Sequence, residues 1–328
     1  MRLAALLTLA LLVASPLRAE CVGQNLIAAL PADQRAAIMA ATAAVPYPAG
    51  NLWQATRDGQ QITLVGTFHL DDPRHAATLT TLTPTLLAAK TLLVEAGPQE
   101  EAALKSYVAD HPERLINTTG PTLPEALPEA DWLRLSQALR DRGIPPFFAA
   151  KMQPWYVSTL LAIPACQFAE AAAMNGLDRR LIALAQSQGM TVAALEPFDT
   201  IFAVFDGFAQ VDQLAILMQT LDASAADDDM AVTLADSYFA GESRLFWEFS
   251  KLQLKTVSGL TEAEVDREFA LVEEALINRR NRAWIDRITA EAAQRPVLVA
   301  FGALHLSGAN GVLNLLARDG WTITRLDQ

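Results

Sequence analysis

Cysteine and histidine are scarce in this sequence, whose 328 residues include two cysteines and four histidines. Two cysteines are too few for a zinc site built on cysteine ligands. Several catalytic motifs are absent as well, namely a Gly-x-Ser-x-Gly elbow, a P-loop, a Gly-x-Gly-x-x-Gly fingerprint and a His-Glu-x-x-His helix. The sequence therefore offers no support for the enzyme classes that these motifs define.

Positive charge is also in short supply, with 25 Lys and Arg against 37 Asp and Glu. Without residues 1–19, which hold two of the arginines, 23 basic residues face 37 acidic ones, a net charge of −14. Such a charge repels phosphate groups, so nucleic acid and anionic lipid are excluded as expected partners. Hydrophobic residues make up 52% of the chain, which predicts a well-buried core rather than disorder.

The long apolar run at the N-terminus predicts the compartment. Arg2 precedes the uncharged, almost wholly apolar segment Leu3–Ala14, and small residues follow near position 19. This layout is typical of a cleavable signal peptide, here residues 1–19, and it predicts a periplasmic or secreted protein with no stable membrane anchor after cleavage. A lipoprotein cut before Cys21 is the alternative, and Glu20 disfavours it because a small residue is needed there.

The two cysteines, Cys21 and Cys166, have two possible states. In an oxidising compartment they are predicted to form one disulfide, which would fasten the mature N-terminus to the domain. Two unpaired, buried thiols are the alternative. A second apolar segment, Met152–Ala169, is interrupted by Pro154 and Pro164. It therefore predicts a pair of buried helices rather than a membrane span.

The hydropathy pattern predicts an α/β fold (mixed α+β) over residues 45–328, preceded by a helical lead-in at residues 20–44. Four short apolar runs are typical of core strands: Gln61–His69, Thr91–Glu95, Met190–Glu196 and Pro296–His305. Between the third and fourth runs the sequence is helical from Asp199 to Gln294, with a loop expected at residues 222–229. We therefore expect a central, mostly parallel sheet flanked by helices, with a large helical insertion between the third and fourth core strands.

The core strands share one property, because each ends in a residue that can bind a metal ion or transfer a proton. These residues are His69, Glu95, Glu196 and His305. In open α/β sheets, sites form beyond the carboxyl ends of strands. Both histidines stand in the same Gly-x-x-His context, after Gly66 and Gly302, where glycine permits a tight bend or a close backbone approach. Imidazole and carboxylate ligands suit a divalent ion such as zinc, manganese or cobalt.

His69, Glu95 and His305 are therefore the predicted metal ligands, although a histidine at a strand end can also serve as a structural hydrogen-bonding residue. Glu196 is the candidate general base or a further ligand. Arg280 and Asn281 lie in the helix predicted to begin at Thr261, with Arg280 close to its apolar face. A buried arginine needs an anionic partner, either Glu95 or a substrate oxyanion. The histidines His75 and His111 are expected on the surface or in loops.

At these residues the sequence resembles the TraB/GumN (TraB/PrgY/GumN) family, which is related to Tiki-type metalloproteases. The similarity spans roughly residues 45–326. It rests on Gly66–His69 with Asp72–Arg74, on Val94–Glu95, Gly176–Asp178, Leu195–Glu196 and Arg280–Asn281, and on Gly302–His305 with Gly308 and Gly311. The resemblance implies a mixed sheet flanked by helices, with both Gly-x-x-His histidines and a glutamate in one active site. The Tiki relatives imply a metal-dependent peptidase.

The leading hypothesis is a metal-dependent, peptidase-like hydrolase that acts on a peptide or small polar substrate. His69, Glu95 and His305 would hold the ion, Glu196 would act as general base, and Arg280 would bind an oxyanion or carboxylate, with Asn281 beside it in the catalytic group. One alternative is a non-catalytic envelope protein that binds a peptide or saccharide in the same cleft. Another is metal-free hydrolysis with histidine as the general base.

Overall fold

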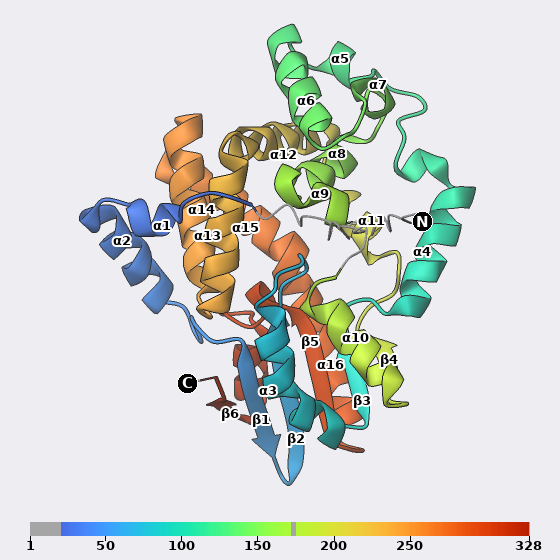
Figure 1. The fold of residues 1–328 in the computed structure, drawn as a ribbon, viewed down its shortest axis with the longest axis vertical. Coiled ribbons are helices and arrows are strands. Elements are labelled where there is room, and N and C mark those ends of the chain that lie inside the picture. The colour runs from blue at the N-terminus through green and yellow to red at the C-terminus, as the bar shows by residue number, and fades with distance from the viewer. Residues whose placement is uncertain (1–20, 172–174, 328) are drawn as a thin grey trace, which may run out of the picture.

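The computed structural model describes residues 21–171 and 175–327, so the predicted signal peptide at residues 1–19 lies outside the described residues. The predicted lead-in forms two helices, α1 (Leu26–Ala29) and α2 (Ala32–Ala43). They pack on the helical part of the molecule, and the chain then enters the sheet (Figure 1).

The described strands form one six-stranded sheet in the order β4-β3-β5-β2-β1-β6. Their bounds are β1 (Leu52–Arg57), β2 (Gln60–Thr67), β3 (Thr91–Val94), β4 (Thr191–Ala194), β5 (Val297–Gly302) and β6 (Thr322–Arg325). The pairs β4–β3, β3–β5 and β5–β2 are parallel, whereas β1 is antiparallel to both β2 and β6. The prediction of a mostly parallel sheet flanked by helices is confirmed.

Strand β1 was missing from the sequence prediction. It forms a hairpin with β2 through Asp58 and Gly59, both of which have positive φ, 49° and 80°. Two consecutive positive φ values are what a tight two-residue hairpin turn requires. Within β1, Trp53 and Ala55 are buried and their neighbours are only partly buried. Two buried positions in six residues are a weak alternating pattern, which explains why the sequence does not predict this strand.

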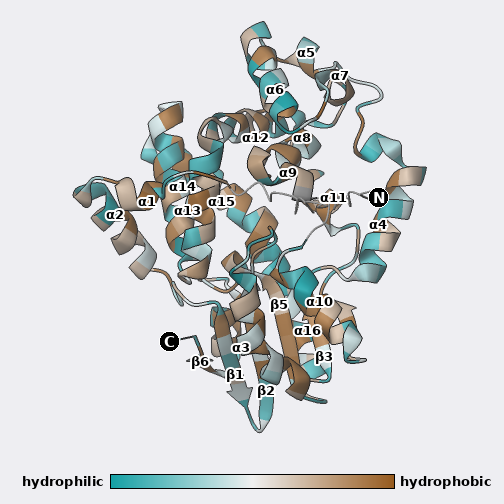
Figure 2. Cartoon of the chain, viewed as in Figure 1, coloured by the Kyte–Doolittle hydropathy of each residue, from teal (hydrophilic) through white to brown (hydrophobic). Residues whose placement is uncertain are grey.

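Strand β5 occupies the centre of the parallel part and lies between β2 and β3. Strand β4, expected to be buried, is an edge strand that is largely half-buried. Residues Val297–Phe301 are all buried, and β5 is brown along its length in Figure 2. The most continuously apolar strand thus takes the position that is covered on both faces.

Helices cover both faces of the sheet. The helices α3 (His75–Ala88) and α10 (Leu177–Ser187) pack on one face, and α16 (Arg279–Ala292) and α17 (Val312–Arg318) pack on the other. Trp284 and Ile288 of α16, for example, contact β5 residues in one continuous core. The sheet is therefore held between two layers of helices, which fixes the direction of its strand ends.

The remaining helices gather beyond one end of the sheet (Figure 1). They are α4 (Pro98–Asp110), α5 (Leu123–Ala126), α6 (Glu129–Asp141), α7 (Pro146–Ala149), α8 (Pro154–Leu161), α9 (Ala165–Ala171), α11 (Thr200–Phe205), α12 (Gln210–Ala223), α13 (Asp227–Phe239), α14 (Ser243–Ser258) and α15 (Glu262–Glu273). Short turns η1 (Pro112–Arg114), η2 (Ser224–Ala226) and η4 (Ala303–His305) and the π-helical segment η3 (Glu274–Asn278) complete the described structure.

Two expectations about the helical insertion can be compared with these bounds. The segment Met152–Ala169 forms the predicted pair of helices, α8 and α9. No helix in the part of the chain that the structure describes is long and apolar enough to cross a membrane. The loop expected at residues 222–229 is wrong, because α12 continues to Ala223 and only η2 separates it from α13. Alanine residues around this point favour helix, so the acidic residues did not mark a loop.

Cys21 and Cys166 form a disulfide with a Cα–Cα distance of 5.3 Å, which confirms the predicted pairing. The bond joins the lead-in to α9 across 145 residues of sequence. Hydrogen bonds extend this attachment, because the backbone N–H of Leu26 donates to Thr233 and the Asn25 amide donates to Asp236, both in α13. The lead-in is thus fastened to the helical region beyond the sheet.

Candidate active site

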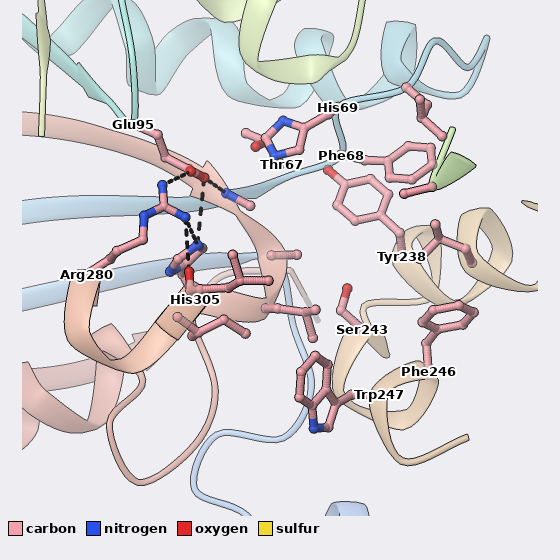
Figure 3. Close-up of a pocket in the computed structure, with 18 residues that line it drawn as sticks. Thr67, Phe68, His69, Glu95, Tyr238, Ser243, Phe246, Trp247, Arg280 and His305 are labelled. Atoms are coloured by element: carbon pink, nitrogen blue, oxygen red, sulfur yellow. Dashed lines mark hydrogen bonds and ion pairs between the residues drawn. The ribbon is translucent and has the colours of Figure 1, made fainter. Parts of the chain in front are cut away.

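Three of the four residues predicted from the strand ends, namely His69, Glu95 and His305, line one pocket of about 450 Å³ beyond the carboxyl ends of β2, β3 and β5. His69, Glu95, Arg280 and His305 all face it (Figure 3). The strands are shorter than predicted. His69 lies two residues beyond the end of β2, and His305 lies in the 3₁₀ turn η4 after β5. These residues therefore extend from the loops and turns where the strands diverge, rather than from the strands themselves.

Glycine at positions 66 and 302 allows the two Gly-x-x-His segments to approach each other. A Cβ at Gly66 would lie 2.7 Å from Leu306 Cδ1 and 2.9 Å from the Cα of Ala303. A Cβ at Gly302 would lie 3.3 Å from His69 Nε2 and 3.4 Å from a carboxylate oxygen of Glu95. The contacts at Gly66 are shorter than a real Cβ atom makes, whereas those at Gly302 are tight and would require the His69 or Glu95 side chain to shift slightly. The repeated glycine thus has a steric cause on each strand, and Gly302 leaves open the space between His69 and Glu95.

Asn281 determines which nitrogen of His305 carries the proton. The Asn281 amide nitrogen donates to two backbone carbonyls, at 3.2 Å to His305 and 2.9 Å to Asn310. Its carbonyl oxygen therefore faces His305 Nδ1, 2.6 Å away, and can only accept. His305 must carry its proton on Nδ1, which leaves Nε2 unprotonated. Burial outweighs the opposing attraction of Glu95 and lowers the pKa of His305 to about 4, so the ring is neutral near pH 7.

Asp178 holds His69 in the same manner. Its carboxylate lies 3.2 Å from His69 Nδ1, which places the donor proton on that nitrogen and leaves Nε2 towards the pocket. Desolvation lowers the pKa of His69, but the hydrogen bond and charge of Asp178, together with Glu95, raise it to about 9. The His69 side chain is 61% exposed, so water in the open pocket screens part of this attraction. A carboxylate behind a histidine is a typical arrangement for orienting a metal ligand or a proton-transfer group.

Glu95 lies between the two histidines and is held at both oxygens. The backbone N–H of Gly302 donates to one oxygen and Arg280 to the other, each at 2.6 Å. The first oxygen is 4.0 Å from His305 Nε2. Burial favours the neutral acid, but His305, Arg280 and His69 together lower the pKa of Glu95 to about 2. Glu95 is therefore a fixed carboxylate at the polar end of the pocket.

Arg280 connects the pocket to a second carboxylate behind it. Its guanidinium pairs with Glu196 through two hydrogen bonds, of 2.9 and 2.6 Å, and Trp284 also donates to Glu196 at 3.1 Å. Desolvation opposes the charge, but Glu196 and Glu95 raise the pKa of Arg280. Both oxygens of Glu196 are thus engaged, and the described residues that line the pocket do not include it. This geometry favours positioning of Arg280 by Glu196 over the predicted role as general base.

The π-helical segment η3 ends two residues before Arg280, and two of its residues, Leu276 and Ile277, lie in the pocket wall. The guanidinium also donates to the Leu276 carbonyl at 3.0 Å. A π-helical turn shifts the register of the residues on a helix face, and such turns are frequent at functional sites. The helix predicted to begin at Thr261 is thus two helices, α15 and α16, joined by η3, and a capping box between Thr261 and Glu264 marks its start.

The donor set can be compared with what a divalent ion requires. Two imidazole Nε2 atoms and one carboxylate suit zinc, manganese or cobalt in chemistry and in orientation, once His69 releases the proton that its raised pKa retains near pH 7. In the described residues, however, the donor atoms of His69, Glu95 and His305 do not all lie within 4.8 Å of one another. The cluster that meets this limit, Cys21, Cys166 and Asp228, contains the disulfide and is not a ligand set. The three residues are thus of the right type to bind a divalent ion, but His69 lies farther from the other two than ligands of one bound ion would.

Several residues at the site were not among the predicted functional residues. Asp178 stands in the matched Gly-Leu-Asp segment, so its sequence context was a usable signal. The aromatic wall, formed by Phe68, Tyr238, Phe246 and Trp247, carried no distinguishing pattern. The expected surface position of His75 is wrong, because its side chain is completely buried and it contacts the Leu70 carbonyl at 3.0 Å. Aromatic neighbours surround its ring, and the helix that begins at His75 points it inward.

The fold and the site define a class of protein: an α/β domain with paired Gly-x-x-His turns and a carboxylate at the carboxyl ends of parallel strands. The sequence model of the TraB/PrgY/gumN family matches residues 51–325. This chain belongs to that family. No curated protein matches the sequence.

Proposed function

We propose that this chain is an exported, metal-dependent hydrolase that cleaves a peptide or small polar substrate at the polar end of the pocket. One observation carries the proposal. His69 and His305 are each held at Nδ1 by a side chain from behind, so that both Nε2 atoms face the space beside Glu95. Structural histidines need no such common direction. The disulfide is compatible with the periplasmic or secreted location that this proposal includes.

The residues of the site have distinct tasks in this proposal. A divalent ion held by His69, Glu95 and His305 would act as a Lewis acid that polarises a scissile carbonyl. Arg280, held by Glu196, would donate to negative charge that develops on the substrate oxygen. Asn281 and Asp178 orient the two imidazoles. The aromatic wall lines the other side of the same pocket and offers apolar contact to the substrate.

Elemental analysis of the purified chain tests the metal assignment. We expect about one ion per chain in the parent, and loss of the ion in His69→Ala and in His305→Ala. His111→Ala is the matched control, because His111 lies on the surface with a side chain that is 47% exposed. Peptide cleavage that chelation abolishes and added metal restores would support the enzyme. Parent-like metal content in both site variants would contradict the assignment.

One observation favours a second candidate, metal-free hydrolysis with His69 as the proton-transfer group. The Asp178–His69 pair has the form of a carboxylate-oriented general acid–base, and His69 Nε2 faces the pocket. Cleavage that is insensitive to chelation but lost in Asp178→Asn would support this candidate against the first. Peptide binding without turnover, under either condition, would instead support a binding protein.

A further inference from the structure

A second cavity of about 180 Å³ adjoins the candidate active site between α8, α12 and α13. It shares three wall residues with the main pocket, namely Ala162, Leu234 and Phe246. Figure 3 shows Phe246 at the opposite end of the pocket from Glu95 and Arg280. The second cavity therefore continues from the aromatic end, away from the groups proposed to carry the chemistry.

The walls of this cavity are largely apolar, and their polar groups already have partners. The hydroxyl groups of Thr220 and Ser224 donate to backbone carbonyls of their own helical segment, at 2.8 Å in each case. Asp227 accepts from Arg142 at 2.7 Å and from the backbone N–H of Ala165 at 2.9 Å. A polar occupant would lose its hydrogen bonds to water and find few replacements. The lining is thus suited to an apolar group.

We propose that this cavity is a specificity subsite, which receives an aromatic or branched aliphatic side chain of the substrate while the scissile group lies beside Glu95. This inference rests on the proposed function and adds the chemistry of the substrate to it. Two features of the cavity suggest its occupant. The cavity adjoins the main pocket, with three wall side chains in common, and its volume is close to the roughly 150 Å³ of an engineered apolar cavity that binds benzene.

Ala231→Leu is the variant that tests the subsite. Ala231 is buried, lines the second cavity and is not a residue of the main pocket, so a larger side chain fills the subsite without touching the site of chemistry. Ala215→Leu on α12 is the matched control, since Ala215 is exposed. Met230→Ala enlarges the same cavity and keeps the test informative if the leucine variant does not fold.

The first measurement is independent of catalysis. Crystals of the parent, Ala215→Leu and Ala231→Leu are soaked in bromobenzene, and the anomalous signal of bromine locates the probe. We expect bromine between α8, α12 and α13 in the parent and the control, and its loss in Ala231→Leu. If Ala231→Leu does not fold, stronger occupancy in Met230→Ala than in the parent supports the subsite. Bromine that never enters this cavity in the parent would overturn the proposal, whatever the protein does to peptides.

The second measurement uses blocked peptides that differ at one position, alanine against leucine or phenylalanine, in the metal-loaded protein. We expect the parent and Ala215→Leu to favour the larger side chain at least about tenfold in kcat/KM. The preference should disappear in Ala231→Leu and shift towards phenylalanine in Met230→Ala. Equal preference in all four proteins would refute the subsite while leaving the hydrolase intact. Absence of any cleavage, together with bromine in the cavity, would refute the hydrolase and leave an apolar binding site.

Discussion

Replacing Asn281 offers a sharp test of how the site is built, because this side chain is completely buried and makes three hydrogen bonds. Alanine would remove the donor to two backbone carbonyls, of His305 and Asn310, and the acceptor for His305 Nδ1–H. Each buried group left without a partner costs about 1–3 kcal/mol. Since nearby water and small shifts recover part of this, we expect Asn281→Ala to lower the free energy of unfolding by about 2–4 kcal/mol.

The tautomer of His305 is the more discriminating readout. Without the Asn281 oxygen, only the long contact from Arg280 Nη1–H, 3.4 Å from His305 Nε2, still favours the proton on Nδ1, and a proton on Nε2 would block that atom as a ligand. Nitrogen NMR of the His305 ring should therefore show a protonated Nδ1 in the parent and a mixture of tautomers in Asn281→Ala, with reduced metal content. The control is Asn314→Ala, which loses one hydrogen bond near the surface. An unchanged tautomer and unchanged metal content in Asn281→Ala would refute the reasoning.

Three further predictions concern the surroundings of the site. Gly66→Ala should lower the free energy of unfolding by about 1–3 kcal/mol and weaken metal binding, because the new Cβ would lie 2.7 Å from a side-chain carbon of Leu306. The control Gly207→Ala, whose Cβ would have its nearest contact at 3.4 Å, should lower stability much less. Equal Tm values in the two variants would contradict this prediction. Burial lowers the pKa of His75 below 6.5, so the unfolded state takes up a proton at a higher pH than the folded state does, and stability falls as the pH drops below about 6.5. His75→Phe should therefore show a smaller fall in Tm between pH 7 and pH 5 than the parent. An equal fall in both proteins would contradict this prediction. Replacing both Cys21 and Cys166 with serine should lower the free energy of unfolding by about 5 kcal/mol, because the disulfide closes a loop of 145 residues and so restricts the unfolded chain. A loss below about 1 kcal/mol in urea titrations would contradict this prediction.

The sequence was informative where function imposes a rare residue at a strand end. His69, Glu95 and His305 come from three separate runs, and the parallel strands bring them to one pocket because the carboxyl ends of β2, β3 and β5 meet at one edge. The glycine before each histidine also indicated close backbone packing, which the structure shows at both positions. The family resemblance covered nearly the same residues as the family match, 51–325.

What the sequence could not provide was the direction of side chains across long separations. The pairing of Glu196 with Arg280 spans 84 residues, and that of Asp178 with His69 spans 109. Short-range patterns in the sequence cannot predict such contacts. For this reason the sequence predicts Glu196 as general base or further ligand, and predicts no role for Asp178. The order of strands was hidden for a related reason. The position of β5 between β2 and β3 depends on which strand best fills a site covered on both faces, a property of the assembled sheet.

The formal charges at the polar end of the pocket give an independent argument for a cation there. Three carboxylates lie at or behind this end of the pocket: Glu95 and Glu196 pair with the guanidinium of Arg280, and Asp178 contacts the imidazole of His69. The fixed groups thus carry two negative charges in excess. His69, with a pKa of about 9, offsets one of them when it is protonated. A divalent ion would offset both. Removing a carboxylate by Glu95→Gln should therefore weaken the affinity for metal more than it weakens the fold, as measured by metal titration alongside thermal unfolding, and unchanged metal affinity would show that the excess charge serves another purpose.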